Sequence, residues 1–357
     1  MMLSDNSGCQ DKPETVLALE PGHIHIALIT SGKLGDALIS LVIANNLARV
    51  GFVVTVCNDF VHSLADWLPA LFTRPEFGPN EYPDGFANFD LVLVDAQSPN
   101  LPAEGSNLRR ELASRAVFFG LSHFDASLNG RFDRTLFPAD RRELLGSLLV
   151  GNGLARNRAE KGRSMVEHVC AFCRRELNLK NVTQEIGLVA PVGISTMPDP
   201  DRIIICPTSG KARKNWLATR FLELATQLKA KGKEPVFTVA PSERADWRRQ
   251  LGNKFELAKT DSASELAALL VSASAVVCND SGVGHLAGAL GTPVLCIISR
   301  RDPFYTWRPG WGAVTLVRPA LPVRALPQVW PYLVSVTAVL RRLDVLLEKT
   351  TTPNQEG

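Results

Sequence analysis

The sequence predicts an α/β protein of two domains, each built on a parallel sheet covered by helices, with a cleft between the domains. The main observation is an alternation of short apolar segments, typical of strands, with segments of helical periodicity. This alternation stops at residues 187–201, which contain prolines and glycines but little periodicity, and then starts again. The length of 357 residues also fits two domains of roughly 150 residues each.

The first half opens with a strand–turn–helix–strand unit. A short run rich in isoleucine and leucine leads into a turn with glycines at positions 32 and 35. From Asp36 onward apolar residues recur at helical spacing, and Gly51 ends the pattern. Units of this kind build parallel sheets. In this half we predict strands at His23–Thr30, Phe52–Cys57, Phe89–Asp95 and Ala116–Gly120, and helices from Asp36 to Val50 and from Ser164 to Leu177.

The second half repeats the alternation after the linker. Ser262 and Glu265 have the spacing of a capping box ahead of an apolar run, which predicts a helix start. We predict strands at Arg202–Cys206, Pro235–Val239, Ala275–Cys278 and Val294–Ile298, and helices at Leu217–Lys229, Leu266–Val271, His285–Leu290 and Leu333–Leu347. The predicted domains are a Rossmann-like N-terminal domain (1–186), a linker (187–201), a Rossmann-like C-terminal domain (202–330) and a C-terminal helical segment (331–357).

Composition and charge exclude several classes of protein. Hydrophobic residues make up 45% of the chain and charged residues 21%, which excludes disordered and collagen-like chains. The 39 Lys and Arg residues nearly balance the 36 Asp and Glu residues, so no nucleic-acid partner is expected. Seven cysteines are an odd and sparse set rather than a disulfide framework. The N-terminus lacks the features of a signal peptide, so we expect a cytoplasmic protein, with peripheral contact at the inner face of the cytoplasmic membrane left open.

The stretch from Asn279 to His285, N-D-S-G-V-G-H, carries the most information about function. It connects a predicted buried strand to a predicted helix. Its glycines let the backbone approach a ligand, and free N–H groups at the helix start favour an anion such as a diphosphate. Asp280 can accept hydrogen bonds from a sugar. A tight turn, with Asp280 or Ser281 as the N-cap and His285 packed inside, explains the same residues, and the pattern does not decide between the two.

A second candidate stretch, Cys206 to Trp216, also follows a predicted strand, at the end where α/β folds bind ligands. Small and hydroxyl residues precede its cations. Between Ile205 and Phe255 there are 11 Lys and Arg residues but only 4 Asp and Glu, which suits a phosphate-bearing substrate. A solvated basic face is the alternative. The spacing is not that of a P-loop. The candidate ligand-binding residues here are Thr208, Ser209, Gly210 and Lys214.

The third stretch is the turn around Gly35 and Asp36, where the first predicted strand leads into its helix. A carboxylate there, facing the predicted cleft, could take a proton from a substrate hydroxyl. The alternative is that Asp36 serves only as a helix N-cap. The turn does not match the G-x-G-x-x-G fingerprint of dinucleotide-binding proteins, which disfavours a dehydrogenase.

Two other patterns give weaker hypotheses. Cys170 and Cys173 form a C-x-x-C on a predicted helix, without the further ligands that a structural metal site needs. Asp199, Pro200 and Asp201 superficially resemble the metal-binding D-x-D of some sugar transferases, but they lie in the predicted linker. We therefore expect no metal site and no cofactor.

Taken together in their order along the chain, the motifs resemble the ADP-heptose:lipopolysaccharide heptosyltransferase family, glycosyltransferase family 9. The segments that carry the resemblance are Gly35–Ser40, Pro207–Trp216, Asn279–His285, Ala289–Pro293, Asp302-Pro303 and Trp307–Pro309. Two departures stand out. Leu217 replaces a proline that usually follows the tryptophan, and residues 58–142 match no pattern, which leaves the acceptor open.

The resemblance implies a GT-B architecture and an inverting, metal-independent transfer of heptose from ADP-heptose to a lipopolysaccharide inner-core or related acceptor. The acceptor would bind the N-terminal domain and the donor the C-terminal one, and the last helix would pack back on the N-terminal domain. By position, Asp36 corresponds to the catalytic base, Lys214 to the diphosphate-binding lysine and Glu243 to a ribose-binding glutamate. The donor-binding loop corresponds to Asp280, Ser281, Gly282, Val283, Gly284 and His285.

Other functions remain open at the level of sequence. A sugar-nucleotide epimerase or hydrolase of the same fold would share the donor loops but need no acceptor. A scaffold that binds nucleotide sugars without catalysis is a non-enzymatic alternative, although it would not need the carboxylate of Asp36. Ligand carried through purification, identified by mass spectrometry, would distinguish these classes.

Overall fold

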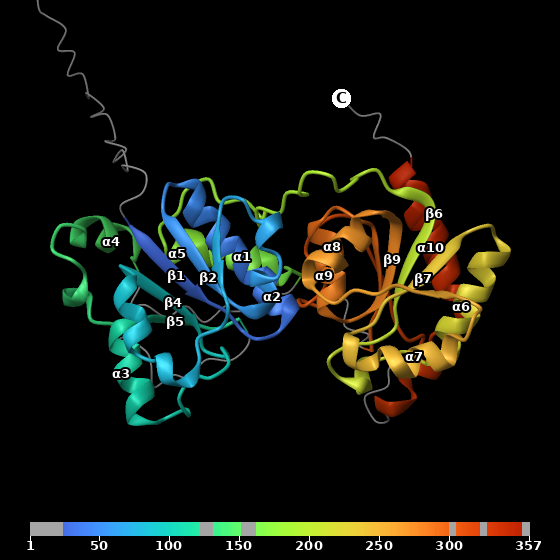
Figure 1. Ribbon diagram of the computed structural model, residues 1–357, viewed down its shortest axis with the longest axis horizontal. Helices are drawn as coiled ribbons and strands as arrows, with labels where there is room; N and C mark the ends of the chain where they lie inside the picture. Colours follow the sequence, from blue (N-terminus) through green and yellow to red (C-terminus); the bar gives the residue numbers. More distant parts are fainter. Residues whose placement is uncertain (1–23, 122–130, 151–161, 300–304, 322–326, 352–357) are drawn as a thin grey trace, which may run out of the picture.

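The computed structural model describes residues 24–121, 131–150, 162–299, 305–321 and 327–351. Each half of the chain contains one parallel sheet with helices packed against it, so the predicted α/β class is confirmed (Figure 1). The segment Asp302-Pro303, which contributed to the family resemblance, lies outside the described residues.

The N-terminal sheet has five parallel strands in the order β3-β2-β1-β4-β5. The four predicted strands are present, each slightly shorter than expected, and the short edge strand β3 was not predicted. The strands are β1 (His25–Ile29), β2 (Val53–Cys57), β3 (Phe72–Arg74), β4 (Leu91–Asp95) and β5 (Val117–Phe119). The helices are α1 (Leu34–Arg49), α2 (Asp59–His62), α3 (Asn107–Arg115), α4 (Arg142–Leu148) and α5 (Met165–Arg175).

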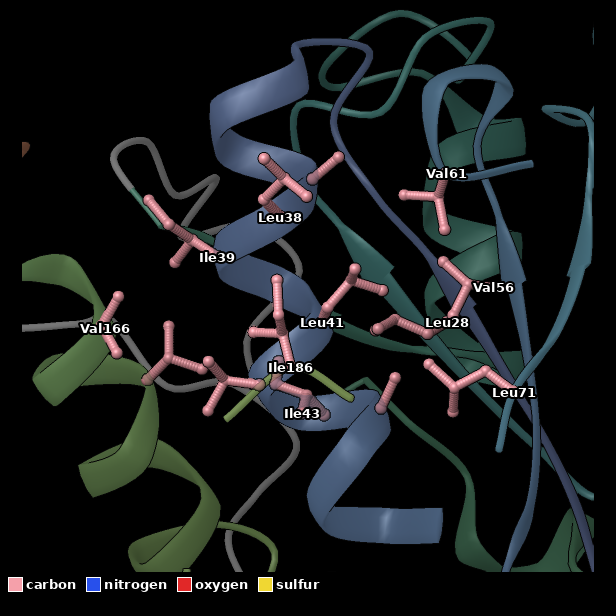
Figure 2. Packing of buried hydrophobic residues seen from close by; sticks show 14 of the residues in the cluster. Leu28, Leu38, Ile39, Leu41, Ile43, Val56, Val61, Leu71, Val166 and Ile186 are labelled. Atoms are coloured by element: carbon pink, nitrogen blue, oxygen red, sulfur yellow. The ribbon is translucent and has the colours of Figure 1, made fainter. Parts of the chain in front are cut away.

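Helix α1 is the centre of the N-terminal core. Its residues from Ala37 to Leu47 are buried on every side. Figure 2 shows the reason: Leu28 and Val56 of the sheet lie on one side of α1, and Val166 of α5 lies on the other. A helix that is packed between a sheet and a second helix needs apolar residues all round. This packing fixes the start of α1, and with it Asp36, relative to the carboxyl ends of the strands.

The C-terminal sheet has six parallel strands in the order β11-β10-β9-β6-β7-β8. All four predicted strands of this half are present, and Ser262 caps a helix as predicted by accepting from the N–H of Glu265. The strands are β6 (Asp199–Cys206), β7 (Glu234–Phe237), β8 (Glu256–Leu257), β9 (Ala273–Asn279), β10 (Val294–Ile297) and β11 (Val314–Val317). The helices are α6 (Ala218–Ala230), α7 (Arg244–Leu251), α8 (Ala263–Val271), α9 (Gly282–Ala289) and α10 (Val336–Thr351).

Two predictions about this half need correction. Asp199 and Asp201, assigned to the linker, belong to β6, and Asp201 pairs with Lys233 at 2.9 Å. The last helix, α10, packs against α6 and β11 of the C-terminal half, and not back on the N-terminal domain (Figure 1). The physical reason is its apolar face, whose residues Val339 and Leu343 are part of the core cluster around the C-terminal sheet. The domain limits themselves remain a prediction.

The two halves contact each other along several elements. α1 packs against α9. The indole N–H of Trp67 donates to Ser264 Oγ at 3.0 Å, and the N–H of Met165 donates to the carbonyl of Thr306 at 2.9 Å. Within the part of the chain that the structure describes, we find no helix that combines the length and apolar character needed to cross a membrane.

Candidate active site

The loop after β9 leads directly into α9, and its glycines are needed for close packing. A Cβ atom at Gly284 would lie 2.9 Å from Cys278 Sγ, so the helix could not sit this close to its strand with a larger residue. A Cβ atom at Gly282 would lie 2.8 Å from the backbone nitrogen of Gly35. Ser281 is the N-cap residue but makes no side-chain capping bond, and Val283 is half-buried in the first turn. The glycines therefore let the start of α9 pack closely against β9 and against the start of α1.

Lys214 and Asp280 meet in front of α9. The ammonium group of Lys214 lies 2.7 Å from Asp280 Oδ2, and the hydroxyl of Tyr305 donates to the same oxygen at 2.5 Å. The sequence placed Lys214 and Asp280 in one site, and the structure brings them together. The sequence did not predict Tyr305 as part of this site, because a single tyrosine that follows the strands and helices of the second half belongs to no recognisable motif.

Asn279 joins the two donor-side stretches. Its side chain is fully buried, accepts from the N–H of Trp216 at 2.9 Å and donates to the carbonyl of Pro207 at 2.7 Å. The loop after β6 is thus held against the end of β9, which places Lys214 beside Asp280. An amide at this position can satisfy both a donor and an acceptor of the backbone, which a carboxylate could not.

The small residues of the β6 loop differ in their contacts. Ser209 Oγ hydrogen-bonds Asn215 Oδ1 at 2.6 Å and donates to the carbonyl of Lys211 at 3.1 Å. Thr208 is half-buried. Gly210 is exposed, and a Cβ atom there would meet no other atom within 4 Å. The packing therefore gives no reason for a glycine at position 210.

In the N-terminal half, Asp36 lies in the first turn of α1. The helix begins at Leu34 with Lys33 as its N-cap residue, so the alternative in which Asp36 is only an N-cap is wrong. Asp36 Oδ2 accepts from Ser31 Oγ at 3.4 Å and from the Lys33 ammonium at 3.3 Å. Its side chain is mostly covered, with 16% of its surface exposed. The free N–H groups of the first turn favour a negative charge there.

The N-termini of α1 and α9 meet at Gly35 and Gly282, one from each half of the chain. A Cβ atom at Gly35 would lie 3.1 Å from His285 Cδ2 and 3.4 Å from Gly282 Cα. His285 is 5% exposed, and no hydrogen-bond partner of its Nδ1 is found among the described residues. Burial lowers the pKa of His285, while the charges of Asp280 and Asp36 act in the opposite direction. The imidazole is therefore neutral at physiological pH and lies near both candidate carboxylates.

Not every predicted residue joins this arrangement. Glu243 ends a short 3₁₀ turn after β7, and within the described ranges no hydrogen bond or ion pair links its carboxylate to Lys214 or to the 279–285 loop. Its ribose-binding role remains a prediction. Cys170 and Cys173 are buried in α5, and burial raises the pKa of both thiols, so they have the character of core residues.

Comparisons with known proteins identify the family. Residues 142–317 match the family model described as glycosyltransferase family 9 (heptosyltransferase). A search of curated proteins gives no match.

Solved structures resemble the chain over almost its whole length. A glycosyltransferase family 9 structure from Veillonella parvula DSM 2008 is 16% identical with a TM-score of 0.65, covering 93% of this chain and 99% of that one. ADP-heptose lps heptosyltransferase II from E. coli is 17% identical with a TM-score of 0.63, covering 92% and 100%. The E. coli heptosyltransferase WaaC with ADP is 14% identical with a TM-score of 0.59, covering 90% and 100%.

These likenesses confirm the predicted GT-B architecture, two Rossmann-like halves with parallel sheets. At such low identity they show the fold, while the family model adds the sequence evidence that identifies a glycosyltransferase. The chain is thus a glycosyltransferase whose residues 142–317 match family 9, the heptosyltransferase family.

Proposed function

We propose that this glycosyltransferase moves heptose from ADP-heptose to a lipopolysaccharide inner-core or related acceptor, with inversion at the anomeric carbon and without a metal ion. The observation that carries the proposal is the meeting of two helix N-termini. α1 brings the carboxylate of Asp36, and α9 brings free N–H groups beside Lys214 and Asp280. Gly35 and Gly282 allow these two ends to touch.

In the proposed step, the carboxylate of Asp36 accepts the proton of the attacking hydroxyl. The hydroxyl oxygen forms a bond to the anomeric carbon from the side opposite the diphosphate, and the departing diphosphate keeps the electron pair of the broken bond. Lys214 and the N–H groups at the start of α9 offset the negative charge that develops on the diphosphate. Because attack and departure occur on opposite faces, one base from the N-terminal half and one cationic site from the C-terminal half are sufficient.

The ion pair of Lys214 and Asp280 suggests how the donor is received. A diphosphate would compete with Asp280 for the Lys214 ammonium, which is now 2.7 Å from that carboxylate. Asp280 would then be available to accept hydrogen bonds from hydroxyl groups of the sugar. The choice of ADP-heptose is supported by one similar protein, the E. coli heptosyltransferase WaaC, whose structures contain ADP or ADP-2-deoxy-2-fluoro heptose.

The acceptor and the cellular location rest on the family. E. coli ADP-heptose lps heptosyltransferase II is named for lipopolysaccharide, and we propose an acceptor of that class for this chain. Such an acceptor carries lipid, so we also propose a cytoplasmic enzyme that works at the inner face of the cytoplasmic membrane.

The direct test is incubation with ADP-heptose, with and without a lipid A–Kdo acceptor, followed by mass spectrometry of the products. The proposal predicts ADP release that depends on the acceptor, and an acceptor heavier by one heptose. Release of ADP at the same rate without an acceptor would indicate a hydrolase. Conversion of the nucleotide sugar to an isomer would indicate an epimerase. Tight donor binding with no conversion would favour a scaffold.

A further inference from the structure

A second carboxylate lies at the same end of the N-terminal sheet as Asp36. Asp95 is the last residue of β4, and β4 pairs with β1, which leads into the turn before Asp36. In the order β3-β2-β1-β4-β5, the chain continues from β1 to one edge of the sheet and from β4 to the other. Open parallel sheets bind ligands in the crevice at the carboxyl ends of such a strand pair. Asp95 and Asp36 therefore belong to one crevice.

Two packed loops hold Asp95 in place. Ser98 Oγ donates to the carbonyl of Asp95 at 2.8 Å and to the carbonyl of Ile29 at 3.3 Å, which joins the ends of β4 and β1. The turn after β1 packs on the same loop, because a Cβ atom at Gly32 would lie 2.6 Å from Pro99 Cγ. The two carboxylates are thus carried by segments that cannot move independently.

Asp95 is buried without a cationic partner. The residue is 1% exposed, and its Oδ1 accepts from the N–H of Gln97 at 2.9 Å. Within the part of the chain that the structure describes, no Lys, Arg or His side chain lies within ion-pair distance of its carboxylate. Burial of an unpaired carboxylate is unfavourable, and an amide oxygen could accept the same N–H of Gln97, so the packing explains an oxygen at this position but not a charge.

The groups that face Asp95 come from three elements. The turn into α1 brings the charges of Asp36 and Lys33. From α3, the Arg109 guanidinium donates to the carbonyl of Ala96, at 2.7 Å. β5 pairs the apolar Phe119 with Asp95.

Burial raises the pKa of Asp95 to about 7. The N–H of Gln97 opposes the rise, the charge of Asp36 adds to it, and Lys33 opposes it. Asp95 therefore changes its charge near neutral pH.

We propose that Asp95 is a positioning residue for proton transfer, whose negative charge beside Asp36 favours movement of the acceptor proton onto Asp36. This inference rests on the proposed function. In the step, the proton passes from the acceptor hydroxyl to Asp36, and Asp95 neither gains nor loses one. A negative charge on Asp95 repels the negative charge on Asp36, and this repulsion is relieved when Asp36 takes up the proton. The ionised form of Asp95 thus stabilises the transition state relative to the ground state.

The first test is the pH dependence of kcat with ADP-heptose and the acceptor. In the unmodified enzyme kcat should rise about threefold to tenfold between pH 6 and pH 8, with an inflection near 7. Asp95→Asn should remove the inflection and keep kcat at the level of the low-pH form. The matched control is Asp90→Asn, the same substitution just before the other end of β4, which should leave the inflection in place. An inflection retained in Asp95→Asn, or a flat profile in the unmodified enzyme, would overturn the proposal.

A second variant serves if Asp95→Asn folds poorly. The side chain of Lys33 is 64% exposed, so Lys33→Gln should fold normally. Its charge lowers the pKa of Asp95, and its loss should move the inflection of kcat to higher pH. An inflection that stays at the same pH, or moves down, would contradict the proposal.

A melting experiment needs no substrate and separates this proposal from the proposed function. Asp95 has a raised pKa in the folded state, so its contribution to the stability of the unmodified protein should fall as the pH rises from about 4 towards 7. The melting temperature of Asp95→Asn relative to the unmodified protein should therefore increase from pH 5 to pH 8. A constant difference would overturn the role of Asp95. If the difference in melting temperature grows with pH but the unmodified protein transfers no heptose, the proposed function is contradicted and the raised pKa of Asp95 is not.

Discussion

Lys214 is the residue at which donor binding can be tested most directly. Its ammonium lies 2.7 Å from Asp280 Oδ2, next to the start of α9, so a diphosphate bound there should contact it. A charge-assisted phosphate contact contributes about 1.5–3 kcal/mol, so Lys214→Ala should weaken ADP binding by on the order of tenfold to a hundredfold in calorimetry. Lys211→Ala, in the same basic stretch but exposed, is the control and should bind ADP normally. Unchanged affinity in a folded Lys214→Ala would remove Lys214 from the site.

Asp36 distinguishes a transferase from a protein that only binds nucleotide sugars. Asp36→Asn keeps the size of the side chain and an oxygen for Ser31 and Lys33, but it removes the proton acceptor. Because the proposed donor contacts lie in the C-terminal half, ADP should bind normally, while transfer should slow at least about a hundredfold, as expected for loss of a general base. The loss of a charge in the first turn should cost about 0.3–1 kcal/mol of stability.

Two measurements accompany this test. Thermal unfolding controls for structural damage, and a drop of many degrees would assign Asp36 a structural role. Transfer by Asp36→Asn at nearly the original rate would show that the carboxylate is not the base.

At the residue level, the sequence predicts those members of the candidate site that lie in the segments following a strand. Asp36, Lys214 and Asp280 were found because strand–turn–helix boundaries mark ligand sites in α/β proteins. Tyr305 was missed because its contact with Asp280 depends on how the chain returns after β10. Asp95 ended a predicted strand, but its burial depends on the neighbouring loops, which the sequence does not specify.

At the level of elements, the contact between α1 and α9 gives a prediction about glycine. A Cβ atom at Gly282 would lie 2.8 Å from the backbone nitrogen of Gly35, so Gly282→Ala must push the two helix starts apart. A displacement of about 1 Å between reacting groups can cost a hundredfold in rate, so transfer by Gly282→Ala should fall by on the order of tenfold to a hundredfold. Rates should be measured together with thermal unfolding.

Gly146→Ala is the matched control for this prediction. Both changes add one methyl group to a glycine of a helix, but a Cβ atom at Gly146 in α4 meets no atom within 4 Å. Gly146→Ala should therefore transfer heptose at the original rate. Equal rates for the two variants would show that the contact between α1 and α9 does not matter for transfer.

The central strands have apolar runs in their own sequence and were predicted. The edge strands β3, β8 and β11 were not predicted: β3 and β8 have only three and two residues and no apolar run, and β11 has only four residues. The amphipathic pattern of α10 was also recognised. Its partner was wrongly assigned, because a pattern shows that a helix has an apolar face but not which surface covers that face.

At the scale of the whole molecule, the sequence predicts two halves but not how they are joined. The hydrogen bonds from Trp67 to Ser264 and from Met165 to Thr306 connect residues far apart in the chain. Neither pair belongs to a motif, and their distances depend on the packing of both sheets. The resemblance to family 9 supplied the expectation that Asp36 and the donor loop face each other, and the contact of Gly35 with His285 supports it.

The arrangement of charges across the two halves leads to the expectation that transfer needs no divalent metal. In the proposed step, Lys214 and the N–H groups of α9 offset the charge on the departing diphosphate. Asp199 and Asp201, the residues that resemble a metal-binding pair, belong to β6, where Asp201 is paired with Lys233. Excess EDTA should therefore leave the rate of heptose transfer unchanged. Activity that EDTA abolishes and that magnesium or manganese restores would show instead that the diphosphate leaves with a metal ion.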